Sequence, residues 1–161
     1  MVQRLDEGMQ SLAEVIKKTT GKDITNYPGA GAARGMGGGL LAFFNAELKP
    51  GTELLLKAID FSEKIKGADL IITGEGKADR QTAMGKVPYG ILKEAQKEHI
   101  PVIVLAGSIE NLPELNKAGF KGIFSIAPGP ITLEKAMEPE FAKENITRLV
   151  SQLYSVITSF G

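Results

Sequence analysis

Short apolar runs that alternate with helical segments in the carboxy-terminal part of the chain constrain the fold most. Apolar runs at 69–72, 101–107 and 122–126 are bounded by polar turn residues, which is typical of buried parallel strands. Helical patterns at 88–98 and 112–118 separate these runs. Because parallel strands need a crossover connection, this order predicts βαβ units and an α/β fold, a Rossmann-like three-layer domain with a parallel sheet.

The first part of the chain has a different pattern. Apolar residues at helical spacing over 5–16 predict a first helix, and a glycine-rich run follows at 28–39 with the sequence PGAGAARGMGGG. The next stretch, LLAFFNAEL, predicts a buried helix with Phe43 and Phe44 in the core. The run matches neither a Walker loop nor a dinucleotide fingerprint after a strand. Close packing of two elements and an anion-binding loop at a helix start therefore both remain open for it.

The composition excludes several classes of protein. Lys plus Arg and Asp plus Glu number 19 each, which argues against a nucleic-acid or membrane-surface partner, since both need a concentrated basic face. The chain has no cysteine, so disulfides and thiolate sites are excluded, and its single histidine, His99, excludes a multi-histidine metal site. The amino-terminal residues are charged and no long apolar stretch occurs, so we expect a cytoplasmic protein.

The stretch 73–86, TGEGKADRQTAMGK, has many acidic, basic, amide and hydroxyl side chains close together, and it is expected to form the loop after the first strand. Open parallel sheets bind ligands beyond the carboxyl ends of their strands. Glu75 and Asp79 could hold Mg²⁺ through carboxylate oxygens, or Asp79 could accept the proton of a substrate hydroxyl. Other residues offer positive charge or backbone N–H groups to an anion, although a solvated surface loop would show the same polarity. They are Lys77, Arg80, Lys86, Gly74 and Gly76.

Taken together, three stretches resemble the glycerate kinase family of the bacterial, two-lobed type. They are PGAGAARGMGGGLLAFFNAELKPG, GADLIITGEGKADRQTAMGKVPYGI and IPVIVLAGS, and their order and spacing agree with that family. One departure is Arg34, which occupies a place where the family commonly has glycine. Members of the family are much longer, so the resemblance implies a carboxy-terminal portion of a two-domain enzyme. A helical, glycine-rich segment over 1–66 would belong to a second lobe, and 67–161 would form the Rossmann-like portion.

The resemblance implies transfer of the γ-phosphoryl group of ATP to a hydroxyl of D-glycerate, with ATP and Mg²⁺ as cofactors. It gives Asp79 the role of base or Mg²⁺ ligand and Glu75 that of Mg²⁺ or substrate ligand. Lys86 would neutralise phosphate or the glycerate carboxylate. The expected substrate- or phosphate-binding residues are Gly29, Gly31, Gly74, Gly76, Gln81 and Thr82.

The expected partners are D-glycerate and a nucleotide, without nucleic acid or membrane, and a homodimer is left open. Because the family's cleft lies between two lobes, this portion alone is expected to lack part of the active site. One alternative is a noncatalytic α/β module that binds a small molecule or phosphate without turnover. Another is a dinucleotide-dependent oxidoreductase, but no acidic residue ends a second strand about 20 residues after Gly35, where ribose would be held.

Overall fold

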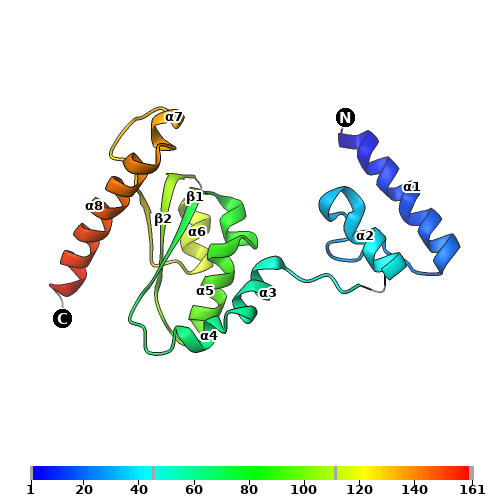
Figure 1. Cartoon of the computed structure of the whole chain (residues 1–161), viewed down its shortest axis with the longest axis horizontal. Helices are drawn as coiled ribbons and strands as arrows, with labels where there is room; N and C mark the ends of the chain where they lie inside the picture. The colour runs from blue at the N-terminus through cyan, green and yellow to red at the C-terminus, as the bar shows by residue number, and fades with distance from the viewer. Residues whose placement is uncertain (1, 45, 111, 160–161) are drawn as a thin grey trace. The chain divides into compact units, whose positions relative to one another are not determined.

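The computed structural model describes residues 2–44, 46–110 and 112–159 and falls into two compact units, Met1–Gly51 and Thr52–Gly161 (Figure 1). The boundary falls after the first residue of helix α3 (Gly51–Ala58), so the rest of α3 and helix α4 (Phe61–Lys64) belong to the second unit, although the sequence predicts them in the first segment. The boundary at residue 66 concerns the lobes of the longer enzyme and stays a prediction.

The first unit consists of α1 (Val2–Thr20) and α2 (Ala32–Phe44), which pack against each other. The predicted first helix is confirmed, but the prediction that Phe43 and Phe44 are core residues is wrong. Their exposed fractions are 62% and 76%, because they occupy the last turn of α2, after the part of the helix that is buried. The small core of this unit is formed by Ala13, Ile16, Ile24, Ala30, Leu41 and Ala42.

The second unit contains a parallel sheet and confirms the predicted α/β fold. Strands β1 (Ile71–Ala78), β2 (Val102–Ile109) and β3 (Gly122–Ser125) lie in the order β1-β2-β3. The crossover helices α5 (Val87–Lys97) and α6 (Leu112–Ala118) begin and end within one residue of their predicted bounds. A right-handed βαβ arrangement is the usual consequence of such parallel connections.

The core of the second unit lies between the sheet and these two helices. The central strand β2 is buried along most of its length, and Val102 and Val104 are fully enclosed. Helix α5 contacts β1 and β2, and α6 contacts β3. Apolar side chains from all of these elements meet in one cluster, which comprises Ile65, Ala78, Leu92, Ala95, Ile100, Val102, Val104, Ala106, Leu115 and Phe120.

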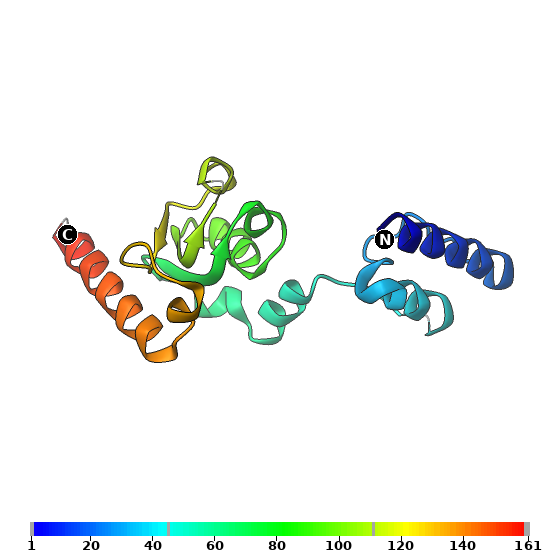
Figure 2. The same cartoon turned by 90° about the horizontal axis from the view of Figure 1, so that it is seen from above.

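The last part of the chain forms α7 (Leu133–Ala136) and the long helix α8 (Pro139–Thr158). In Figures 1 and 2, α8 and α5 lie on opposite sides of the strands. The far end of α8 is poorly covered: Tyr154 is 69% exposed and Ile157 is 48% exposed. Over the described ranges, no helix has the length and apolar character needed to cross a bilayer.

Strand β1 is longer than the sequence predicts. The expected strand ends at residue 72, whereas the observed strand continues to Ala78 and pairs Glu75 with Ala106 and Lys77 with Ser108. The apolar pattern ends early because β1 is an edge strand, whose backbone is paired on one side while polar side chains stay in contact with water. The connecting segment therefore begins at Asp79.

Candidate active site

Asp79 lies where β1 ends and a short 3₁₀ helix, η1 (Arg80–Met84), begins. Its carboxylate Oδ1 accepts hydrogen bonds from the backbone N–H groups of Gln81 at 2.9 Å and Thr82 at 3.3 Å. In return, Thr82 Oγ1 accepts the backbone N–H of Asp79 at 3.1 Å. This reciprocal pair is a capping box, which fixes the orientation of the Asp79 side chain by satisfying the free donors of the helix start.

Lys86 approaches the same carboxylate oxygen. Its Nζ is 3.4 Å from Asp79 Oδ1, and the two side chains are 33% and 21% exposed. Partial burial raises the pKa of Asp79, but the N–H of Gln81, the charge of Lys86 and the N–H of Thr82 outweigh it, so the net pKa is lowered. Within the described residues, no hydrogen bond or ion pair reaches Asp79 Oδ2. Asp79 is thus an ionised carboxylate with one oxygen held and one oxygen free.

Two further charged residues lie on β1 before Asp79. Glu75 is half-buried opposite Ala106, and no described residue pairs with its carboxylate. Lys77 Nζ lies 2.8 Å from Glu110 Oε1, and this hydrogen bond raises the pKa of Lys77. Glu110 was not predicted as a site residue, although it lies three residues after the second predicted strand and directly after the observed β2, at the same sheet edge.

The two residues predicted to orient the substrate, Gln81 and Thr82, have different surroundings. The Gln81 side chain is exposed, so its predicted contact with a ligand stays a prediction. Thr82 is completely buried, and its hydroxyl also lies 3.5 Å from the carbonyl oxygen of Lys77. Its hydroxyl therefore serves the turn around Asp79 and does not face solvent.

Gly74 and Gly76 belong to β1 and not to a loop as predicted. The space where a side chain would stand is open at both: a Cβ added at Gly74 would meet only the Leu105 carbonyl oxygen, at 3.9 Å, and one at Gly76 would meet nothing within 4 Å. By contrast, a Cβ at Gly107 would come within 2.7 Å of the Gly76 carbonyl oxygen. Glycine at 107 thus permits close approach of the two backbones, while Gly74 and Gly76 leave the sheet edge accessible.

Close packing explains most of the glycine-rich run in the first unit. A Cβ at Gly37 would lie 2.4 Å from the Gly29 carbonyl oxygen, and one at Gly38 would lie 2.7 Å from Ile24 Cδ1. Gly29 also has a positive φ of 87°, which glycine adopts without strain. Within this run, a Cβ added at Gly31 or at Gly39, in α2, would meet nothing within 4 Å. An anion contact in this run stays a prediction, and Gly31 and Gly39 are the positions where packing leaves space.

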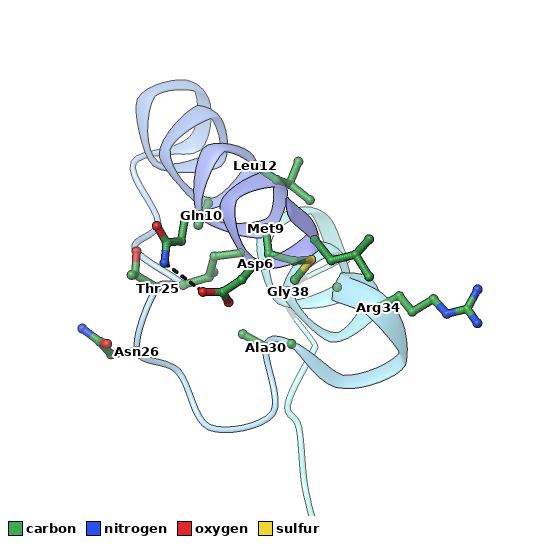
Figure 3. A pocket seen from close by; sticks show the side chains of 14 residues that line it. Asp6, Met9, Gln10, Leu12, Thr25, Asn26, Ala30, Arg34 and Gly38 are labelled. Carbon is green, nitrogen blue, oxygen red and sulfur yellow. Dashed lines mark hydrogen bonds between the residues drawn. The ribbon is translucent and has the colours of Figure 1, made fainter. Parts of the chain in front are cut away.

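Gly31 borders a pocket of about 500 Å³ between α1 and the start of α2 (Figure 3). Its polar lining includes Asp6, which accepts a hydrogen bond from Gln10 at 3.3 Å. Arg34 also lines the pocket, and its side chain extends away from Asp6. Arg34 also has a left-handed backbone conformation, with φ 59° and ψ 40°, which glycine adopts more easily than arginine.

Comparisons with known proteins match this chain over nearly its whole length. The family model described as "Glycerate kinase family" matches residues 1–158. The glycerate kinase of Halalkalibacterium halodurans is 43% identical over 85% of this chain and 36% of its own length. The glycerate 2-kinase of Escherichia coli K12 is 42% identical over 92% of this chain and 39% of its own length.

A solved structure supports the same relationship. The crystal structure assigned to a glycerate kinase 2 from Salmonella typhimurium LT2 has a TM-score of 0.69 and 33% sequence identity, and it covers 99% of this chain and 40% of that chain. The chain thus spans well under half the length of the relatives it matches, and it corresponds to their carboxy-terminal portion. With a family model that covers residues 1–158, the chain belongs to the glycerate kinase family.

Proposed function

We propose that the enzyme containing this segment transfers the γ-phosphoryl group of ATP to a hydroxyl of D-glycerate. The relatives named glycerate kinase support the reaction class. The observation that carries the proposal is Asp79, whose carboxylate is held at the end of a parallel strand with Oδ2 free and Lys86 beside it. In phosphoryl transfer the protein mainly positions the reacting groups and stabilises charge, and this site offers both.

In this proposal the attacking hydroxyl of the substrate donates a hydrogen bond to Asp79 Oδ2. The lowered pKa of Asp79 makes its carboxylate a weak base. It therefore orients the hydroxyl in the ground state and accepts its proton only late, as the new P–O bond forms and the hydroxyl becomes acidic. The ammonium group of Lys86 balances negative charge on the phosphate or on the substrate carboxylate. Its contact with Asp79 limits how far it can move toward either group.

The carboxylates of Asp79 and Glu75 could each give a single ligand to a Mg²⁺ ion bound together with nucleotide, but four residues of extended chain, roughly 13 Å, separate them. Mg²⁺ is usually held by one or two protein carboxylates, with water and phosphate oxygens as its other ligands. The free oxygen of Asp79 or the unpaired carboxylate of Glu75 would supply one such ligand, because no group of three or more His, Cys, Asp or Glu side chains among the described residues could hold a metal by itself. When bound, the ion would neutralise charge on the phosphates. Gly74 and Gly76 keep the neighbouring edge open for those groups.

In the first unit we propose fewer phosphate-binding residues than the sequence predicts. Gly31 borders the pocket and has open space beside it, which supports a backbone contact with a ligand. Gly29 contributes the turn that leads into this region, and its own surroundings are closed by Leu48 at 3.4 Å. We therefore retain Gly31 as a ligand contact and give Gly29 the role of shaping the turn.

The substitution Asp79→Asn in the whole enzyme tests the proposal. Asn keeps an oxygen that can cap η1 but loses the charge. We therefore expect the free energy of unfolding to change by less than about 0.5 kcal/mol. Turnover should fall by about 10²–10⁴-fold, the usual contribution of a positioned acid or base, with little change in KM. ADP release with D-glycerate, ATP and Mg²⁺ measures both. Asp69→Asn, an exposed position before β1, is the matched control and should retain activity. Near-normal turnover of Asp79→Asn would sink the proposal.

A segment of this length could also bind a ligand without turnover, because it spans 36% and 39% of the length of the two relatives described above. Calorimetry with ATP and with D-glycerate, combined with the ADP assay on the same sample, separates the two functions. Binding without ADP release by this chain, together with turnover by the whole enzyme, would show that catalysis needs the remaining portion. Binding without release by both would favour the noncatalytic module.

A further inference from the structure

The environment of Thr82 sets it apart from the other polar residues around Asp79. The neighbouring Gln81 is exposed and the Asp79 side chain is 21% exposed, whereas Thr82 is 0% exposed. A buried hydroxyl is unfavourable unless it forms hydrogen bonds. The hydroxyl of Thr82 accepts the Asp79 N–H at 3.1 Å and lies 3.5 Å from the Lys77 carbonyl oxygen. It therefore connects the last residues of β1 to the first turn of η1.

This connection decides which oxygen of Asp79 is used. A carboxylate has two equivalent oxygens, and rotation of its terminal torsion exchanges them. Here the two backbone donors and Lys86 Nζ all contact Oδ1. The two backbone donors, from Gln81 and Thr82, point at Oδ1 only while the turn over 79–82 stays closed. The Thr82 hydroxyl closes that turn from the opposite direction by holding the Asp79 N–H.

We propose that Thr82 is a positioning residue for phosphoryl transfer: its buried hydroxyl keeps Asp79 Oδ1 engaged inside the turn, so that Oδ2 faces the substrate hydroxyl. This inference rests on the proposed function of Asp79. It assigns Thr82 no contact with substrate, in contrast to the sequence-based expectation. Without the hydroxyl, the carboxylate would sample orientations in which the oxygen facing the substrate is no longer fixed, and catalysis depends on such fixed geometry.

The experiment compares Thr82→Val, which replaces the hydroxyl by a methyl group of similar size, with Thr82→Ser, which keeps the hydroxyl. A matched control is Thr132→Val, because Thr132 also caps a helix, α7, by accepting the Lys135 N–H at 3.3 Å. Turnover and KM are measured on the whole enzyme. The pKa of the Asp79 carboxyl is measured by ¹³C NMR on this chain, which provides a readout that does not require activity.

We expect Thr82→Val to lower kcat about tenfold or more with KM within about twofold, because a misplaced Asp79 carboxylate matters most when it accepts the proton late in the reaction. The pKa of Asp79 should rise toward its ordinary value, since the backbone N–H donors are no longer held in place. Thr82→Ser should keep kcat and the Asp79 pKa close to those of the unmodified protein. Thr132→Val should change neither kcat nor the pKa of Asp79, whatever its effect on stability.

Two results would overturn the inference. One is a Thr82→Val enzyme that is less stable but keeps the kcat and the Asp79 pKa of the unmodified protein, which would make Thr82 structural only. The other is an equal loss in Thr82→Ser and Thr82→Val, which would assign the effect to the methyl group and not to the hydroxyl. If Thr82→Val does not fold, Thr82→Ser alone decides through its kcat. If the unmodified whole enzyme has no kinase activity, the proposed function fails, while the NMR comparison still tests whether Thr82 holds Asp79.

Discussion

The closest backbone contact in the glycine-rich run gives a quantitative test of its packing. A Cβ at Gly37 would lie 2.4 Å from the Gly29 carbonyl oxygen and 3.1 Å from Leu48 Cδ1. Real Cβ atoms do not approach another heavy atom this closely, and a carbonyl oxygen cannot move aside without its peptide unit. Gly39, two residues later in the same helix, has nothing within 4 Å of the equivalent position. Gly37→Ala and Gly39→Ala therefore differ in one respect, the space available for the added methyl group.

The expected difference in stability follows from this pairing. Both substitutions gain about 0.5–1 kcal/mol from the higher helix propensity of alanine. Gly37→Ala additionally incurs the cost of overpacking, about 1–3 kcal/mol, so the two variants should differ by that amount. With a urea slope of about 1–3 kcal/mol per molar, 2 kcal/mol corresponds to a shift of roughly 1 M in the unfolding midpoint. Amide signals from α1 and α2 report on the first unit alone. Free energies of unfolding that agree within about 0.5 kcal/mol would refute the contact between Gly37 and Gly29.

Two further predictions concern charge and backbone strain in the same unit. The hydrogen bond from Lys17 and the N–H of Thr25 lower the pKa of Asp23 to about 2. The folded pKa lies below the ordinary value, so the stabilisation is present above about pH 4 and is lost as the pH falls toward 2; Lys17→Met should raise the Asp23 pKa in an NMR titration. Arg34→Gly should be more stable than Arg34→Ala by roughly 1 kcal/mol in thermal unfolding, because alanine must keep the left-handed backbone of Arg34. Equal stability would show that this conformation carries no cost.

The sequence predicted the sheet better than its polar edge. The runs that became β2 and β3 are apolar because the strands are buried, and burial is what an apolar pattern reports. The second half of β1 escaped prediction because Glu75 and Lys77 lie on an edge strand, where backbone pairing needs no apolar side chains. The prediction that Phe43 and Phe44 are buried was wrong for the opposite reason. Their apolar character predicts burial, but what packs against them is not decided by the local pattern.

The candidate site could be located from the sequence, but its internal organisation could not. A recognisable motif placed Asp79 and Lys86 near each other, and the structure brings them within 3.4 Å. The burial of Thr82 and the pairing of Lys77 with Glu110 depend on backbone direction and on the register between two strands. Residue types at a given spacing do not determine these quantities. For that reason the sequence analysis expected Thr82 to face a ligand.

The unequal use of the two oxygens of Asp79 has a consequence for how variation at this site would be detected. Since Oδ1 carries the capping contacts, an asparagine there can preserve folding, expression level and resistance to proteolysis. A survey of variants that scores protein abundance would then rate Asp79→Asn as benign, while one that scores growth on a substrate requiring the kinase would rate it as a loss. The disagreement between the two surveys at this codon would mark the Asp79 charge as needed for activity and not for folding.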